Sequence, residues 1–185
     1  MSARARADRS GMSTPKILLE LCLLRGQPQD LPASANLLYL CAAFSIGVDY
    51  LIETGHAPGL VRLGFAIAQA VIFGGIIYGI LRLRGVPERF TQSMSALYFA
   101  NGVVSLAAWP VLTQVLSAGV DHAQSWHVLF MAGISIWFIA ILANVLRHAL
   151  DFPLGRSVAV SLMCVLLMMF ASILVTPLFS TVTPG

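Results

Sequence analysis

The sequence predicts an all-α integral membrane protein: a bundle of five transmembrane helices with a short N-terminal interfacial helix. Hydrophobic residues make up 58% of the 185 residues and charged residues only 10%, against about 45–50% and about 25% in soluble domains. The mean hydropathy is +0.84. Five apolar segments each reach the length of about 20 residues that crosses a hydrocarbon core. This composition excludes a disordered chain and a disulfide scaffold. It also excludes a nucleic-acid-binding domain, since the net charge is only +3.

The chain begins with a polar stretch that we divide in two. Residues 1–13 are rich in Arg, Ser and Ala and are expected to form a disordered basic tail. Residues 14–32 are expected to form a cytoplasmic amphipathic segment, in which Pro15 suits the first helical position. Its apolar residues recur on one helical face: Ile17, Leu18, Leu21 and Leu24. Because Lys16 and Arg25 flank this face, we expect the helix to lie on anionic headgroups; the alternative is an unstructured tail.

Residues 33–180 are expected to form a single membrane domain, followed by a tail at 181–185. The five predicted spans cover residues 33–52, 60–83, 92–117, 127–146 and 158–179. Their apolar runs are continuous, whereas strands of a membrane barrel alternate apolar and polar residues. A helix also satisfies its own backbone hydrogen bonds, which lipid cannot do. The connections are short and contain Gly and Pro, so consecutive helices are expected to be antiparallel neighbours.

The second predicted span carries small residues at helical spacing. Ala66, Ala70 and Gly74 form one stripe, and Gly75 and Gly79 form a GxxxG pattern beside it. Small residues let two membrane helices approach closely. Two interpretations remain open: packing against another span of the same chain, which we prefer, and self-association through Gly75 and Gly79.

Prolines occur inside the third and fifth predicted spans. Pro110 and Pro177 each remove a backbone donor, so both predict a kinked helix. Many transporters place such interruptions at corresponding positions of two inverted repeats. Five spans without an evident repeat therefore disfavour a stand-alone transporter.

Lysine and arginine residues lie almost entirely on one side of the predicted spans. The segment before the first span carries five, the second connection three and the fourth connection two, whereas Arg62 alone lies on the opposite side. Short loops rich in these residues stay in the cytoplasm. We therefore expect a multi-pass protein of the cell inner membrane, with a cytoplasmic N-terminus and the C-terminus on the opposite side.

Polar side chains inside the spans are costly unless they find partners. Asp49 is the one acid clearly within a span and lies about one turn from its outer end, so we expect it at the interface rather than in an ion relay. The amides at membrane depth are expected to link helices: Gln69, Asn101, Gln114 and Asn144. If Asp49 and the amides of 69, 101 and 144 line one cavity, transport is favoured; if they pair between helices, a scaffold is favoured.

Histidine and cysteine positions predict no catalytic, cofactor or metal site. Three histidines share the outer side, His56, His122 and His127, and His148 lies opposite. Metal binding by the three remains an alternative, but we favour a place at the headgroup level. Cys22, Cys41 and Cys164 lack CxxC spacing and are expected to act as small hydrophobic residues. Because GxSxG, HExxH and phosphate-loop motifs are also absent, we expect no enzymatic activity.

One stretch of sequence carries a family resemblance. The second connection and the start of the third span read RLRGVPERFTQSMSALYFANGVV, with matching residues at Gly85, Phe90, Gln92, Ala96, Tyr98 and Ala100. Together with a cytoplasmic N-terminal segment and five closely spaced spans over about residues 15–180, this resembles the Yip-domain family of Rab-interacting membrane proteins, in its bacterial form. The resemblance implies a non-enzymatic protein that acts through contacts with other membrane proteins or lipids.

Two functions therefore stand as hypotheses. The first is an inner-membrane protein of Yip-domain type, whose partners are the lipid bilayer, other membrane proteins or a second copy of the chain. The second is a small transporter or channel-like subunit. Neither involves nucleic acid or a cofactor.

The charge asymmetry generates a prediction about topology. A reporter that is active only outside the cytoplasm is expected to be active when fused at Gly119 or Gly185 and inactive at Gly85. Activity is measured in whole cells with matched expression of each fusion. Activity at Gly85 would overturn the predicted orientation.

Overall fold

The computed structural model describes residues 14–26, 28–52, 58–118 and 124–180, and within them every regular element is helical. The α-helices are α2 (Thr14–Cys22), α3 (Ala35–Ile52), α4 (Gly59–Leu83), α5 (Phe90–Ala118), α6 (Ser125–Leu150) and α7 (Leu154–Ser180), and two short 3₁₀ turns are η1 (Pro28–Asp30) and η2 (Pro87–Arg89). The predicted five-helix bundle is confirmed. The tails predicted at 1–13 and 181–185 lie outside the described residues.

The five long helices agree closely with the predicted spans, and the main difference is at the connection of α6 and α7. α6 continues to Leu150 and α7 begins at Leu154, each about one turn beyond the expected limit. The prediction ended these spans at charged residues, because it followed hydropathy. The helices end instead where their backbone hydrogen bonds end, with the Ser157 amide donating to the Pro153 carbonyl at 3.1 Å.

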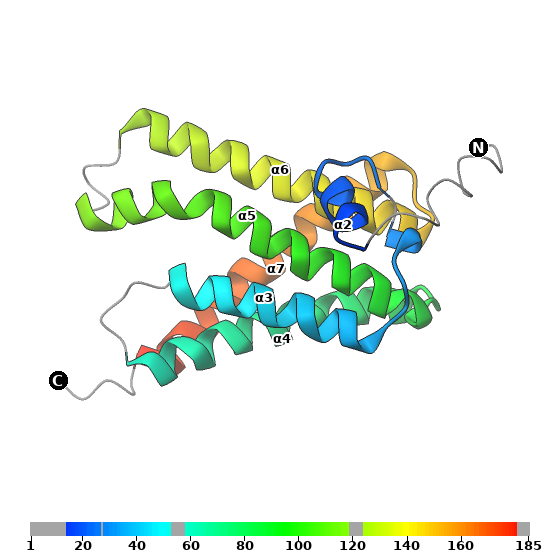
Figure 1. Cartoon of the computed structure of the whole chain (residues 1–185), viewed down its shortest axis with the longest axis horizontal. Coiled ribbons are helices and arrows are strands. Elements are labelled where there is room, and N and C mark those ends of the chain that lie inside the picture. The colour runs from blue at the N-terminus through cyan, green and yellow to red at the C-terminus, as the bar shows by residue number, and fades with distance from the viewer. Residues whose placement is uncertain (1–13, 27, 53–57, 119–123, 181–185) are drawn as a thin grey trace.

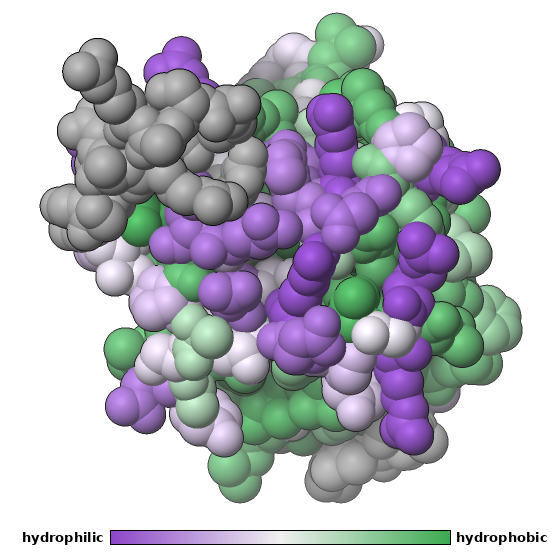
Figure 2. Space-filling model, turned by 90° about the vertical axis from the view of Figure 1, so that its right-hand side faces the viewer, coloured by the Kyte–Doolittle hydropathy of each residue, from purple (hydrophilic) through white to green (hydrophobic). Residues whose placement is uncertain are grey.

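All five long helices are apolar enough and long enough to cross a membrane. Many of their apolar side chains are exposed, most clearly on α7, where Leu166, Phe170 and Ile173 are 61–66% exposed. A face of this kind is stable in lipid and would aggregate in water. Hydrophilic side chains gather instead at one end of the bundle, where the α4–α5 and α6–α7 connections lie (Figure 2).

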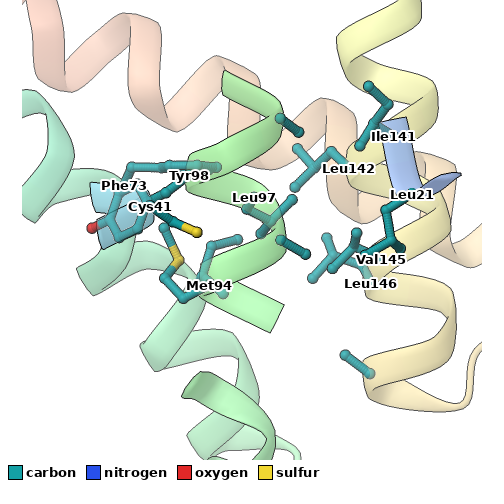
Figure 3. Packing of buried hydrophobic residues seen from close by; sticks show 14 of the residues in the cluster. Leu21, Cys41, Phe73, Met94, Leu97, Tyr98, Ile141, Leu142, Val145 and Leu146 are labelled. Carbon is teal, nitrogen blue, oxygen red and sulfur yellow. The ribbon is translucent and has the colours of Figure 1, made fainter. Parts of the chain in front are cut away.

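α5 is the central helix of the bundle and contacts α2, α3, α4 and α6 (Figure 1). Its buried residues Met94, Leu97 and Ala100 are 0% exposed. Leu97 faces Leu142 of α6, while Tyr98 lies beside Phe73 of α4 (Figure 3). α5 therefore packs against α6 on one side and against α4 on another.

The N-terminal helix α2 packs against the bundle. Ile17, Leu18 and Leu21 of its apolar face are at most 7% exposed, and Leu21 lies beside Val145 and Leu146 of α6 (Figure 3). Leu24, expected on the same face, is 45% exposed and has a positive φ of 62°. The predicted helix is present, but protein covers its apolar face where we expected headgroups.

Backbone carbonyls at the end of α2 and in the segment after it also accept hydrogen bonds from the bundle. Trp137 Nε1 donates to the Cys22 carbonyl at 2.9 Å, and Asn144 Nδ2 donates to the Gly26 carbonyl at 3.4 Å. Farther along, Gln92 Nε2 donates to the Leu31 carbonyl at 2.7 Å. These bonds fix the segment from α2 to α3 across α5 and α6.

Arg89 caps the C-terminal end of α6. Its Nη1 donates to the carbonyls of His148 and Ala149 at 3.2 and 2.9 Å, and to Asp151 Oδ2 at 2.8 Å. The last carbonyls of a helix lack partners within the helix and carry partial negative charge. Arg89 is one of the three basic residues of the second connection, which were used above to predict topology. It therefore also joins η2 to α6.

The small residues of α4 divide between two faces. Ala66, Ala70 and Gly74 are buried, and a Cβ added at Gly74 would lie 2.9 Å from the Tyr98 hydroxyl. A Cβ added at Gly75 or Gly79 would meet nothing within 4 Å. The preferred interpretation, packing against another span of the same chain, therefore holds for the stripe at Ala66, Ala70 and Gly74. It does not hold for Gly75 and Gly79, and self-association through them stays a prediction.

The burial of α2 generates a prediction about Cys22. Burial raises the pKa of the Cys22 thiol to about 11, so roughly one thiol in a thousand is ionised at pH 8, and the thiolate is the reactive form. We expect a water-soluble maleimide to label Cys22 at least about tenfold more slowly than a cysteine at exposed Arg25. The two proteins are C41A/C164A and C22A/R25C/C41A/C164A. Equal rates would show that α2 is not docked.

The contact between α4 and α5 generates a second prediction. Gly74→Ala is expected to lower stability by about 1–3 kcal/mol, because its methyl group displaces the Tyr98 hydroxyl from the Ala70 carbonyl. Gly75→Ala is the matched control, since it makes the same chemical change on the exposed face and gains up to about 1 kcal/mol of helix propensity. Thermal unfolding in detergent measures both. An equal change in the two variants would contradict the close contact.

Candidate functional site

A cluster of polar side chains joins α3 to α5 inside the bundle. Asp49 Oδ1 accepts a hydrogen bond from Ser105 Oγ at 3.0 Å, and Oδ2 accepts one from Asn101 Nδ2 at 3.1 Å. Asn101 Nδ2 also donates to Ser45 Oγ at 2.9 Å. Each helix contributes two residues four positions apart, which places both on the same face.

Asp49 lies deeper than its position in α3 suggests. Its partners Asn101 and Ser105 belong to the middle third of α5, which has 29 residues. At 1.5 Å per residue, Ser105 is about 20 Å from either end of α5. α3 has only 18 residues, and its C-terminal end stops short of the C-terminal end of α5 (Figure 1). Measured on α5, Asp49 therefore lies farther from a helix end than its position in α3 suggests, and its place at the interface stays a prediction.

A cavity of about 230 Å³ adjoins this cluster, between α3, α4, α5 and α7. Its lining residues are Ser45, Asp49, Gln69, Ala70, Phe73, Tyr98, Asn101 and Met168. Gln69 Nε2 reaches across to Ser172 Oγ of α7 at 2.5 Å, and the Tyr98 hydroxyl donates to the Ala70 carbonyl at 2.8 Å. The cavity therefore combines one carboxylate, neutral polar groups and two aromatic rings.

No basic side chain neutralises Asp49 in the part of the chain that the structure describes. Arg62 of α4 lies beside the same end of α3, and its Nη2 donates to the Tyr50 carbonyl at 2.6 Å. Its guanidinium also lies 4.7 Å from the centre of the Tyr50 ring. Arg62 thus caps the last turn of α3 and leaves the Asp49 carboxylate to Asn101 and Ser105.

The arrangement of four polar residues was expected to distinguish a transport protein from a scaffold protein. Three of the four line one cavity. They are Asp49, Gln69 and Asn101. The same three also form hydrogen bonds between helices. The arrangement expected for transport and the one expected for a scaffold are therefore both present. Asn144 lies elsewhere, at the carbonyl of Gly26.

The described histidines and cysteines serve packing and capping. His127 Nδ1 accepts a hydrogen bond from the Gln124 amide at 3.0 Å, and His148 Nδ1 lies 2.8 Å from the Asn144 carbonyl. All three cysteines are free and buried. No group of three or more metal-binding side chains occurs among the described residues; His56 and His122 lie outside them.

Sequence reasoning found Asp49, Gln69 and Asn101 but missed Ser45, Ser105 and Tyr98. The missed signal was the spacing of four residues, Ser45 to Asp49 on one helix and Asn101 to Ser105 on the other. Side chains four apart share a helical face, so each pair marks a polar patch. Tyr98 gave no such signal, because its ring is apolar and only its hydroxyl joins the site.

The chain matches no known family model, and no curated protein or solved structure matches it. The resemblance to the Yip-domain family therefore stays a prediction. The evidence for the five helices that can span a membrane and for the polar cavity comes from the structure of this chain alone.

Proposed function

We propose that this multi-pass membrane protein binds a small cationic solute at Asp49 and acts as a small transporter or channel-like subunit. The observation that supports the proposal is the cavity of about 230 Å³ that Asp49 lines with Gln69 and Asn101. An acid inside a membrane span is expensive, and in most proteins it marks a pathway for an ion or a substrate.

The chemistry around Asp49 favours a cation as the ligand. Each carboxylate oxygen accepts one hydrogen bond from a neutral donor, and each retains a further lone pair. Phe73 and Tyr98 line the same cavity with their rings 6.2 Å apart in an edge-to-face arrangement. Aromatic faces attract ammonium groups, so both the charge and the rings of this cavity suit an organic ammonium.

A second proposed function rests on the hydrophilic end of the bundle. Arg82, Arg84, Arg147 and Arg156 are exposed at or near the α4–α5 and α6–α7 connections, and hydrophilic side chains gather at this end (Figure 2). Basic residues near a membrane surface attract anionic lipids with about 1 kcal/mol each. This end would face the cytoplasm of the predicted inner-membrane topology and serve the contacts that the Yip-domain resemblance implies.

Binding at Asp49 is tested with tetramethylammonium chloride as the probe. We expect it to raise the unfolding temperature of the detergent-purified chain relative to sodium chloride of equal ionic strength. At ten times the dissociation constant the stabilisation is about 1.4 kcal/mol, which corresponds to a shift of a few degrees. The rise is expected to disappear in Asp49→Asn.

Glu88→Gln is the matched control, because it removes one negative charge from an exposed residue far from the cavity. It is expected to keep the full shift. No shift in the wild-type chain, or an equal shift in Asp49→Asn, would overturn binding at this site. Transport is tested by the release of tetramethylammonium from proteoliposomes, followed with an ion-selective electrode. Binding without release would show that the chain binds the cation but does not transport it.

A further inference from the structure

A second cavity of about 290 Å³ lies between α5, α6 and α7. Its walls are mainly aliphatic, aromatic and sulfur-containing side chains, among them Val104, Ile134, Phe138, Leu142, Val165 and Met169. Asn101 is one of its few polar residues, and Ser135, which lies at the exposed side, donates its hydroxyl to the Met131 carbonyl at 2.9 Å. A group that fills this cavity must therefore be apolar.

The two cavities are adjacent. Phe73, Asn101 and Met168 line both of them, so these three side chains form the boundary between the polar and the apolar space. Methionine is unbranched and adapts its shape readily, which makes Met168 the part of the boundary that moves most easily. Asn101 is the polar group on this boundary and is bonded to Asp49.

We infer that the ligand is an amphipathic organic ammonium, with its charged group at Asp49 and its apolar group in the cavity between α5, α6 and α7. This inference rests on the proposed function and specifies its substrate class. Each cavity alone is smaller than most ligand pockets, which occupy about 300–1,000 Å³. Together they present a carboxylate, two aromatic rings and an apolar space, which matches a cationic head attached to a short apolar tail.

The inference predicts how affinity depends on the tail. Each methylene group that enters the apolar cavity is expected to tighten binding about fourfold, or about 0.8 kcal/mol. The probes are tetramethylammonium, butyltrimethylammonium and hexyltrimethylammonium chloride, all below micelle-forming concentrations. Affinities are measured from the concentration dependence of the unfolding temperature. Decreasing dissociation constants along the series are expected for the wild-type chain.

Val165→Phe is designed to separate the tail from the head, because Val165 lines the apolar cavity and not the one at Asp49. We expect this variant to bind tetramethylammonium as the wild type does and to lose the gain from longer tails. Its response to tetramethylammonium also shows that it is folded, and Ile134→Phe on α6 is a second filling variant. Leu166→Phe is the matched control, since Leu166 is 64% exposed on the outer face of α7, and it is expected to keep the gain.

Failure of the inference differs from failure of the proposed function. If tetramethylammonium binds through Asp49 but longer tails add nothing, the substrate class is wrong and the cation site stands. If Val165→Phe and Leu166→Phe lose the gain equally, the tail does not occupy this cavity. If none of the three probes changes the unfolding temperature of the wild-type chain, the cation site and the inference both fall.

Discussion

A polar group inside a hydrocarbon environment must find its hydrogen bonds within the protein, and in this chain several of those bonds involve α5. Asn101 and Ser105 of α5 bind Asp49 of α3, and Tyr98 binds a carbonyl of α4. Gln92 near its start binds the segment that leads into α3. Because lipid offers no replacement for such bonds, the position of α5 determines the positions of its neighbours.

The spans and the α2 helix could be predicted because hydropathy and helical periodicity are local properties of the sequence. What covers the apolar face of α2 could not, since a helical face of Ile17, Leu18 and Leu21 is equally compatible with lipid and with protein. The bonds that decide this come from Trp137 and Asn144, more than a hundred residues away. Amphipathicity identifies the buried face of a helix but not its partner.

The residues of α5 that lie beside Asp49 could not be predicted for a related reason. Counting residues to the end of its own span assumes that all helices begin and end at the same levels. α3 is shorter than α5 by 11 residues, so a residue in its last turns lies beside the middle of the longer helix. Relative lengths of neighbouring helices, rather than position within one helix, place a charged residue in the bundle. The cavity at Asp49 forms where these unequal helices meet.

The docking of α2 has a consequence for biosynthesis. α2 leaves the ribosome before the five long helices, yet Cys22 is hydrogen-bonded to a residue 115 positions later and Gln29 to one 119 positions later. At about 5–20 residues per second, the nascent chain needs roughly 6–24 s to supply these partners. The hydrogen bonds that hold this segment on α6 therefore form only after the fourth span of the bundle has been synthesised.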